Sequence, residues 1–127
     1  MKLSIIIPAF NEEKLITGCV QKVHEALKTN AASDLTSEII VVDNNSTDGT
    51  AQFARAAGAQ VVFEPINQIS RARNAGAAAA QGDWLLFVDA DSWLSPVTVA
   101  ELLACIRQGR DDDGEFHGVR ALCLPWS

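Results

Sequence analysis

Four short apolar runs alternate with longer segments in which apolar residues recur every three or four positions. The runs, rich in β-branched and aromatic residues, predict strands at residues 3–7, 38–42, 60–63 and 84–88. The helical period predicts helices at about residues 12–28, 50–57, 70–81 and 96–108. Strands and helices that alternate at these lengths form a parallel sheet with helices on both faces. The pattern therefore predicts an α/β fold.

Residues that stop or start regular structure give the expected boundaries. Pro8 should end the first strand, and Asn11 is placed to cap the helix that follows it. Gly58 is suited to close the second helix. Ser95 as the cap, with Pro96 at the first helical position, should begin the last helix.

The run at residues 84–88 has no polar interruption, which suits a strand buried on both faces. Asp89 and Asp91 follow it, and extended geometry would point both the same way, about 6–7 Å apart. The carboxyl edge of an open parallel sheet is where α/β folds bind ligands. One carboxylate could then take a divalent cation while the other reaches a hydroxyl group. The alternative is an ordinary turn, which Asp and Ser favour.

The composition is that of an ordinary globular domain, with 127 residues, 48% of them hydrophobic. The net charge of −6 argues against binding to nucleic acid or to an anionic membrane surface. No run reaches the ~20 apolar residues of a membrane span, and the N-terminal run is too short for a signal peptide. We expect a cytoplasmic location. Cys19, Cys105 and Cys123 lack metal-site spacing, and the first two fall on apolar helix faces as expected buried thiols.

Four segments carry recognisable signatures: residues 4–12, 41–50, 73–76 and 82–91. In this order and spacing they resemble the motifs of family 2 glycosyltransferases of the GT-A fold, over residues 3 to about 108. The resemblance implies a GT-A (Rossmann-like) parallel-sheet α/β/α sandwich, in truncated form. It also implies a nucleotide diphospho-sugar donor, lying across the carboxyl edge of the sheet, and an acceptor that the sequence does not identify.

The resemblance assigns roles to the acidic residues of these motifs. Asp91 is the expected ligand of Mn²⁺ or Mg²⁺, which would bridge to the diphosphate, and Asp89 would contact the ribose or another part of the donor. Asp43 would accept a hydrogen bond from the imide N–H of a base such as uracil, because a carboxylate only accepts. Pro8 and Glu12, in the first motif, are the other expected donor contacts.

Two further motif residues have open alternatives. Phe10 offers a face on which the base can stack, or it is an ordinary core residue. Arg73, or its neighbour Arg71, could place a cation near the diphosphate, or form a surface salt bridge. Asn44 departs from the family pattern, in which a second acid often follows the first Asp.

The chain after Gly109 lacks a clear pattern. We expect residues 1–109 to be the donor-binding half and residues 110–127 to be an irregular tail, the truncated start of an acceptor half. We identify no catalytic base. The 127-residue chain alone should bind a nucleotide diphosphate weakly and transfer no sugar. An open sheet edge beside residues 84–88, with uncovered apolar surface, should favour a homodimer.

Other functions compete with glycosyl transfer. A non-catalytic nucleotide-binding or interaction module needs the same donor residues without a base. Phosphatases of the D-x-D type carry the motif D-x-D-x-[TV] after their first strand. Here the Asp-x-Asp follows the fourth predicted strand, and Trp93 stands where the motif has Thr or Val. Dinucleotide and P-loop sites are excluded, since neither glycine motif follows a strand.

Overall fold

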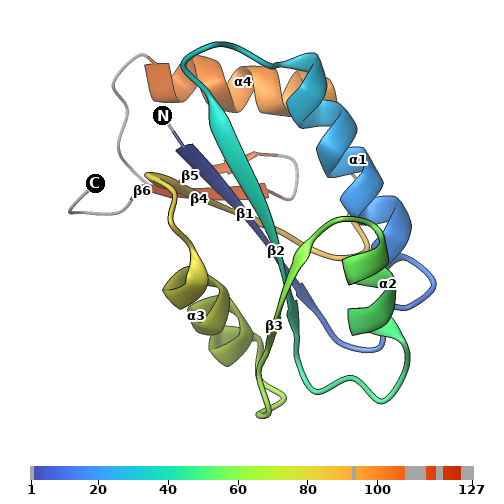
Figure 1. The fold of residues 1–127 in the computed structure, drawn as a ribbon. Helices are drawn as coiled ribbons and strands as arrows, with labels where there is room; N and C mark the ends of the chain where they lie inside the picture. The colour runs from blue at the N-terminus through green and yellow to red at the C-terminus, as the bar shows by residue number, and fades with distance from the viewer. Residues whose placement is uncertain (1, 93, 108–113, 117–118, 124–127) are drawn as a thin grey trace.

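The computed structural model describes residues 2–92, 94–107, 114–116 and 119–123 (Figure 1). In chain order the elements are β1 (Lys2–Ala9), α1 (Ile16–Thr29), β2 (Thr36–Asp43), α2 (Thr50–Ala56), β3 (Gln60–Phe63), α3 (Ile69–Ala79), β4 (Trp84–Val88), α4 (Pro96–Arg107), β5 (Gly114–Phe116) and β6 (Val119–Cys123). The strands of this part of the chain form one sheet in the order β3-β2-β1-β4-β6-β5.

The first four strands are parallel, as the sequence predicts. β1 lies in the middle, with Ile5 opposite Ile39 of β2 and Leu86 of β4. β3 pairs with β2 on the outer side. The carboxyl ends of these strands therefore share one edge of the sheet, and the loops that follow β1, β2 and β4 gather there (Figure 1).

The expected irregular tail is wrong in part. β6 pairs antiparallel with β4, with Leu85 opposite Leu122, and β5 pairs antiparallel with β6. The sheet is therefore mixed, and the edge of β4 that we expected to be open is covered by β6. Self-association through that edge loses its basis, and the homodimer stays a prediction that rests on apolar surface alone.

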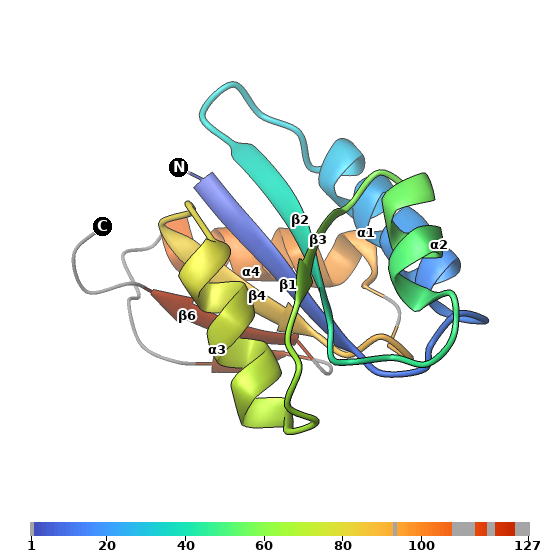
Figure 2. The same ribbon diagram turned by 60° about the horizontal axis from the view of Figure 1, so that its bottom comes forward.

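Helices cover both faces of the sheet. α1, α2 and α4 lie on one face, and α3 is the described helix on the other (Figures 1 and 2). The larger core lies under α1 and α4 and includes Ile5, Ile7 and Leu86, whereas Ile6 and Leu85 point to the smaller core under α3. This alternation is the period of two expected for strands buried on both faces.

Two expected boundaries at the end of β1 are wrong. β1 continues through Pro8 to Ala9. The strand can include the proline because pairing with β4 ends at Ile6, so only β2 lies beside the last residues of β1. A proline is tolerated where one side of a strand has no partner. Asn11 has a φ of 51°, and α1 begins at Ile16 with no side-chain cap.

Other boundaries are confirmed. β3 and β4 have the expected bounds, and α4 begins at Pro96, where Ser95 Oγ accepts a hydrogen bond from Thr98 N at 3.1 Å. Gly58 follows α2 with a φ of 98°, as its expected role in ending the helix requires. Cys19 is a buried free thiol, as expected.

The predictions for Trp93 and for the side chains of Cys105 and Cys123 fall outside the described part of the chain. Among the described residues, no helix combines the length and hydrophobicity that crossing a membrane requires.

Candidate functional site

A cavity of about 600 Å³ lies at the carboxyl edge of the parallel strands. The end of β1, the start of the β2–α2 loop, the segment before α3 and the turn after β4 all contribute to its wall. Its lining residues are Pro8, Ala9, Phe10, Glu12, Asn44, Asn67, Ile69, Asp89, Ala90 and Asp91. The structure thus brings together five of the seven residues that the sequence assigned to donor and metal binding.

Asp89 and Asp91 lie in a turn and not in extended chain. Ser92 N donates to Asp89 O at 2.9 Å, which closes the turn directly after β4. Ala90 is buried at 5% exposure while both carboxylates are exposed. The expectation of an extended Asp-x-Asp is therefore wrong, and the turn presents both acids to the cavity by placing the small residue between them in the core.

Phe10 is 50% exposed and lines the cavity, so the alternative that it is a core residue is wrong. Ile69, 56% exposed, lines the same cavity from the first residue of α3. Two apolar side chains beside carboxylates suit a ligand with both a flat apolar part and a charged part.

Glu12 lies close to other acids. Burial raises the pKa of the Glu12 carboxyl, and the negative charges of Asp91 and Asp48 raise it further. Its main-chain N–H donates to Thr50 Oγ1 at 2.9 Å, which ties the β1–α1 loop to the start of α2. Carboxylates that repel one another at a cavity favour the binding of a cation between them.

The β1–α1 and β2–α2 loops are held together by reciprocal hydrogen bonds. Asn11 Oδ1 accepts from Thr47 N at 2.8 Å, while Asn11 N donates to Ser46 Oγ at 2.9 Å. Glu13 Oε2 accepts from Gly49 N at 2.8 Å. Asn11 therefore binds the β2–α2 loop and does not cap its own helix, and these hydrogen bonds join the two loops along one side of the cavity.

Asp43 and Arg73 are the two assigned residues that do not line the cavity. Asp43 ends β2 at 8% exposure, and its Oδ1 accepts from Ser46 N at 3.0 Å. Arg73 lies on α3, and its Nε is buried without a hydrogen-bond partner among the described residues. Neither is placed at the cavity wall with Asp89 and Asp91.

The sequence reasoning missed Asn44, Asn67 and Ile69 as cavity residues. Asn44 stands next to Asp43 at the end of a parallel strand, so its position at the carboxyl edge was a usable signal. Asn67 lies in the loop between β3 and α3, and Ile69 is the first residue of α3; this loop also lies at the carboxyl edge of the sheet.

The oxygen ligands that the cavity offers fit a hard divalent cation in part. Asp89 and Asp91 supply the oxygen ligands that Mg²⁺ and Mn²⁺ prefer. Within the described part of the chain, no three His, Cys, Asp or Glu side chains group as a metal site. The protein alone would therefore supply one or two carboxylates, the arrangement found where substrate phosphates complete the coordination.

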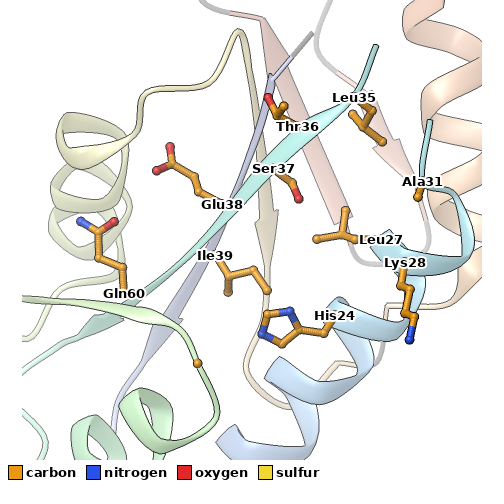
Figure 3. Close-up of a pocket in the computed structure, with 11 residues that line it drawn as sticks. His24, Leu27, Lys28, Ala31, Leu35, Thr36, Ser37, Glu38, Ile39 and Gln60 are labelled. Atoms are coloured by element: carbon orange, nitrogen blue, oxygen red, sulfur yellow. The ribbon is translucent and has the colours of Figure 1, made fainter. Parts of the chain in front are cut away.

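A second cavity, of about 530 Å³, lies at the opposite edge of the sheet, between α1 and the starts of β2 and β3. Figure 3 shows His24, Leu27 and Ile39 facing this space, whereas Glu38 points to the other side of β2. The described lining contains no residue of the four motifs or of the assigned donor and metal set. The cavity beside Asp89 and Asp91 is therefore the candidate site.

The glycosyl transferase family 2 model matches residues 4–114 of this chain. An uncharacterized glycosyltransferase of Mycobacterium bovis is 31% identical over 125 residues, which make up 98% of this chain and 53% of that protein. The chain therefore spans about half the length of this relative.

Two solved structures are similar in both fold and sequence. Glucosyl-3-phosphoglycerate synthase from Mycobacterium tuberculosis, in complex with Mn²⁺, UDP and glucosyl-3-phosphoglycerate, has a TM-score of 0.70 and 28% identity, covering 88% of this chain and 42% of that one. S. aureus TarS 1-349 in complex with UDP-GlcNAc has a TM-score of 0.70 and 30% identity, covering 85% and 32%.

The fold is thus the GT-A fold, covering part of the length of these neighbours. The same four motifs that suggested the family in the sequence lie within the matched region, and three of them supply eight of the ten described lining residues of the cavity. The family match decides against the D-x-D phosphatase. This chain belongs to glycosyl transferase family 2.

Proposed function

We propose that the chain binds a nucleotide diphospho-sugar, UDP-linked, in the cavity beside Asp89 and Asp91, as the donor-binding part of a glycosyltransferase. The observation that carries the proposal is the convergence of Phe10, Glu12, Asp89 and Asp91 on one cavity at the carboxyl edge of the sheet. Similar proteins solved with UDP and Mn²⁺ or with UDP-GlcNAc support it.

The roles follow from the chemistry of each side chain. Asp91 holds Mn²⁺ or Mg²⁺, and Asp89 accepts hydrogen bonds from donor hydroxyl groups. The exposed ring of Phe10 stacks on the base, beside Pro8. When bound, the cation stabilises the charge that develops on the departing nucleoside diphosphate.

Asp43 and Arg73 contact the donor only after side-chain movement, because neither lines the cavity. The second oxygen of the Asp43 carboxylate selects a base that presents an imide N–H, and Arg73 supplies a cation to the diphosphate. UDP should therefore bind more tightly than CDP and ADP. Asp43→Ala should reduce this difference in binding free energy by about 1.5–3 kcal/mol, the value of a hydrogen bond to a charged group.

Calorimetric titration of the chain with UDP, in Mn²⁺ and in EDTA, tests the site. Asp91→Asn should weaken the metal-dependent binding by about tenfold or more, since even outer-shell partners of metal ligands change affinity by this much. Glu25→Gln is the matched control, because it removes one carboxylate from α1 where that side chain is 66% exposed. Equal UDP affinity in Asp91→Asn and Glu25→Gln would remove Asp91 from the site.

Transfer is a separate property from donor binding, because it needs a base within about 3 Å of the acceptor hydroxyl. We predict that the 127-residue chain binds UDP-sugars and transfers none. An assay of the chain with a panel of UDP-sugars and simple acceptors measures transfer. Sustained metal-dependent turnover would show that a base lies within the chain. The cytoplasmic location stays a prediction.

A further inference from the structure

Asn44 connects the end of β1 to the segment between β3 and α3, residues 64–68. Its main-chain N–H donates to Ala9 O at 2.8 Å, and its main-chain oxygen accepts from Asn67 Nδ2 at 2.5 Å. Its side-chain Nδ2 donates to Ile66 O at 2.6 Å and to Glu64 O at 3.2 Å. Asn44 is 6% exposed, so its own end of these hydrogen bonds is shielded from competing water.

The direction of the Asn44 carboxamide follows from its partners. Both are main-chain carbonyl oxygens, which only accept, so the NH₂ end must face them. An aspartate has nearly the same shape but no donor when ionised. It would place a buried carboxylate oxygen against the carbonyl oxygens of Glu64 and Ile66 and leave both without their side-chain donor.

The segment that Asn44 holds forms a wall of the candidate donor site. Asn67 and Ile69 line the cavity, and they stand within and just after this segment. The segment's other ties to the sheet and to itself include Glu64 N to Asp43 O at 2.9 Å and Gln68 N to Ile66 O at 2.8 Å. Loss of the Asn44 side-chain bonds therefore loosens the part of the wall that carries Asn67, which keeps its own bond to the main-chain oxygen of Asn44.

We propose that Asn44 is a positioning residue, which holds Asn67 and Ile69 in place for donor binding, and that the acid often found at this position in the family cannot replace it here. This inference rests on the donor site proposed above. It gives the departure from the family motif a structural role, because the asparagine supplies two donors that an acid lacks.

The test compares two asparagines that are adjacent in the chain. Asn44→Asp should weaken UDP binding in Mn²⁺ by about tenfold or more, because the carbonyl oxygens of Glu64 and Ile66 lose the hydrogen bonds from Asn44 and face a buried negative charge instead. Asn45→Asp adds the same charge at an exposed residue with a φ of 59°, a conformation that Asp also tolerates, and should change UDP binding by less than about twofold. Asn44→Ser, with one donor, should fall between the two.

Two further readouts separate positioning from a general loss of stability. Amide hydrogen exchange at residue 64 and residues 66–69 should accelerate in Asn44→Asp and Asn44→Ser, relative to the exchange of β1 and β4. Asn67→Ala should weaken UDP binding in the wild type but have little further effect in the Asn44→Asp background, since the wall is already displaced.

Equal UDP affinity in Asn44→Asp and Asn45→Asp, or an equal effect of Asn67→Ala in both backgrounds, would overturn the inference. If Asn44→Asp does not fold, Asn44→Ser carries the same comparisons. A wild-type chain that does not bind UDP would refute the proposed function instead, and hydrogen exchange at residue 64 and residues 66–69, which needs no ligand, would still test the role of Asn44.

Discussion

Gly76 permits the close approach of α3 to the sheet, and replacing it tests the packing that supports the site. A Cβ atom added at Gly76 would lie 2.4 Å from Ile6 Cγ2 and 3.0 Å from Val42 Cγ2. Apolar carbon atoms pack at about 3.5–4.0 Å, so α3 would have to move away by about 1 Å. Ile6 and Val42 are fully buried and β-branched, so neither side chain can turn aside readily.

The net effect is the difference between two terms. Overpacking a well-packed core costs about 1–3 kcal/mol, and replacing glycine by alanine inside a helix returns about 1 kcal/mol. We expect Gly76→Ala to lower the free energy of unfolding by up to about 2 kcal/mol. UDP affinity should fall as well, because the displaced helix carries Ile69 at the cavity.

Gly18→Ala is the matched control, because the same change in α1 meets nothing within 4 Å. It should raise the free energy of unfolding by about 0.5–1 kcal/mol through helix propensity alone. Urea denaturation at equal m values measures both variants. The packing argument fails if Gly76→Ala proves as stable as Gly18→Ala.

Two further predictions concern polar groups. Ser4→Ala should lower the free energy of unfolding in urea by about 1–3 kcal/mol, since the buried Ser4 Oγ accepts from Gly82 N at 2.8 Å; exposed Ser37→Ala is the control, and an equal effect would contradict the prediction. A hydrogen bond from the Thr50 hydroxyl, together with main-chain N–H donors, lowers the pKa of Asp48. The contribution of the Asp48 carboxylate to stability is therefore complete above the ordinary pKa of 3.8 and is lost as pH falls through the lower pKa of the folded state. Asp48→Asn should therefore flatten the acid side of a stability–pH curve, and an unchanged curve would refute this.

The sequence determined the elements whose signals are local. β3 and β4 have the bounds that their apolar runs predict, and α4 begins at Pro96 behind its serine cap. The polar residues after β1, β2 and β4 reach one edge because parallel strands share a direction, so the site at the sheet edge was also predictable. The four motifs identified the family for the same reason, since their order and spacing are properties of the chain itself.

Tertiary structure decided the features whose partners lie far along the chain. Asn11 resembles a helix cap in sequence, but its side chain accepts from Thr47, 36 residues away. The Asn44 side chain donates to carbonyl oxygens 20 and 22 residues away. β6 pairs with β4 although α4 lies between them in the chain. A local pattern shows which groups need partners, whereas folding decides which distant group is near enough to satisfy them, because the great majority of buried donors and acceptors are paired.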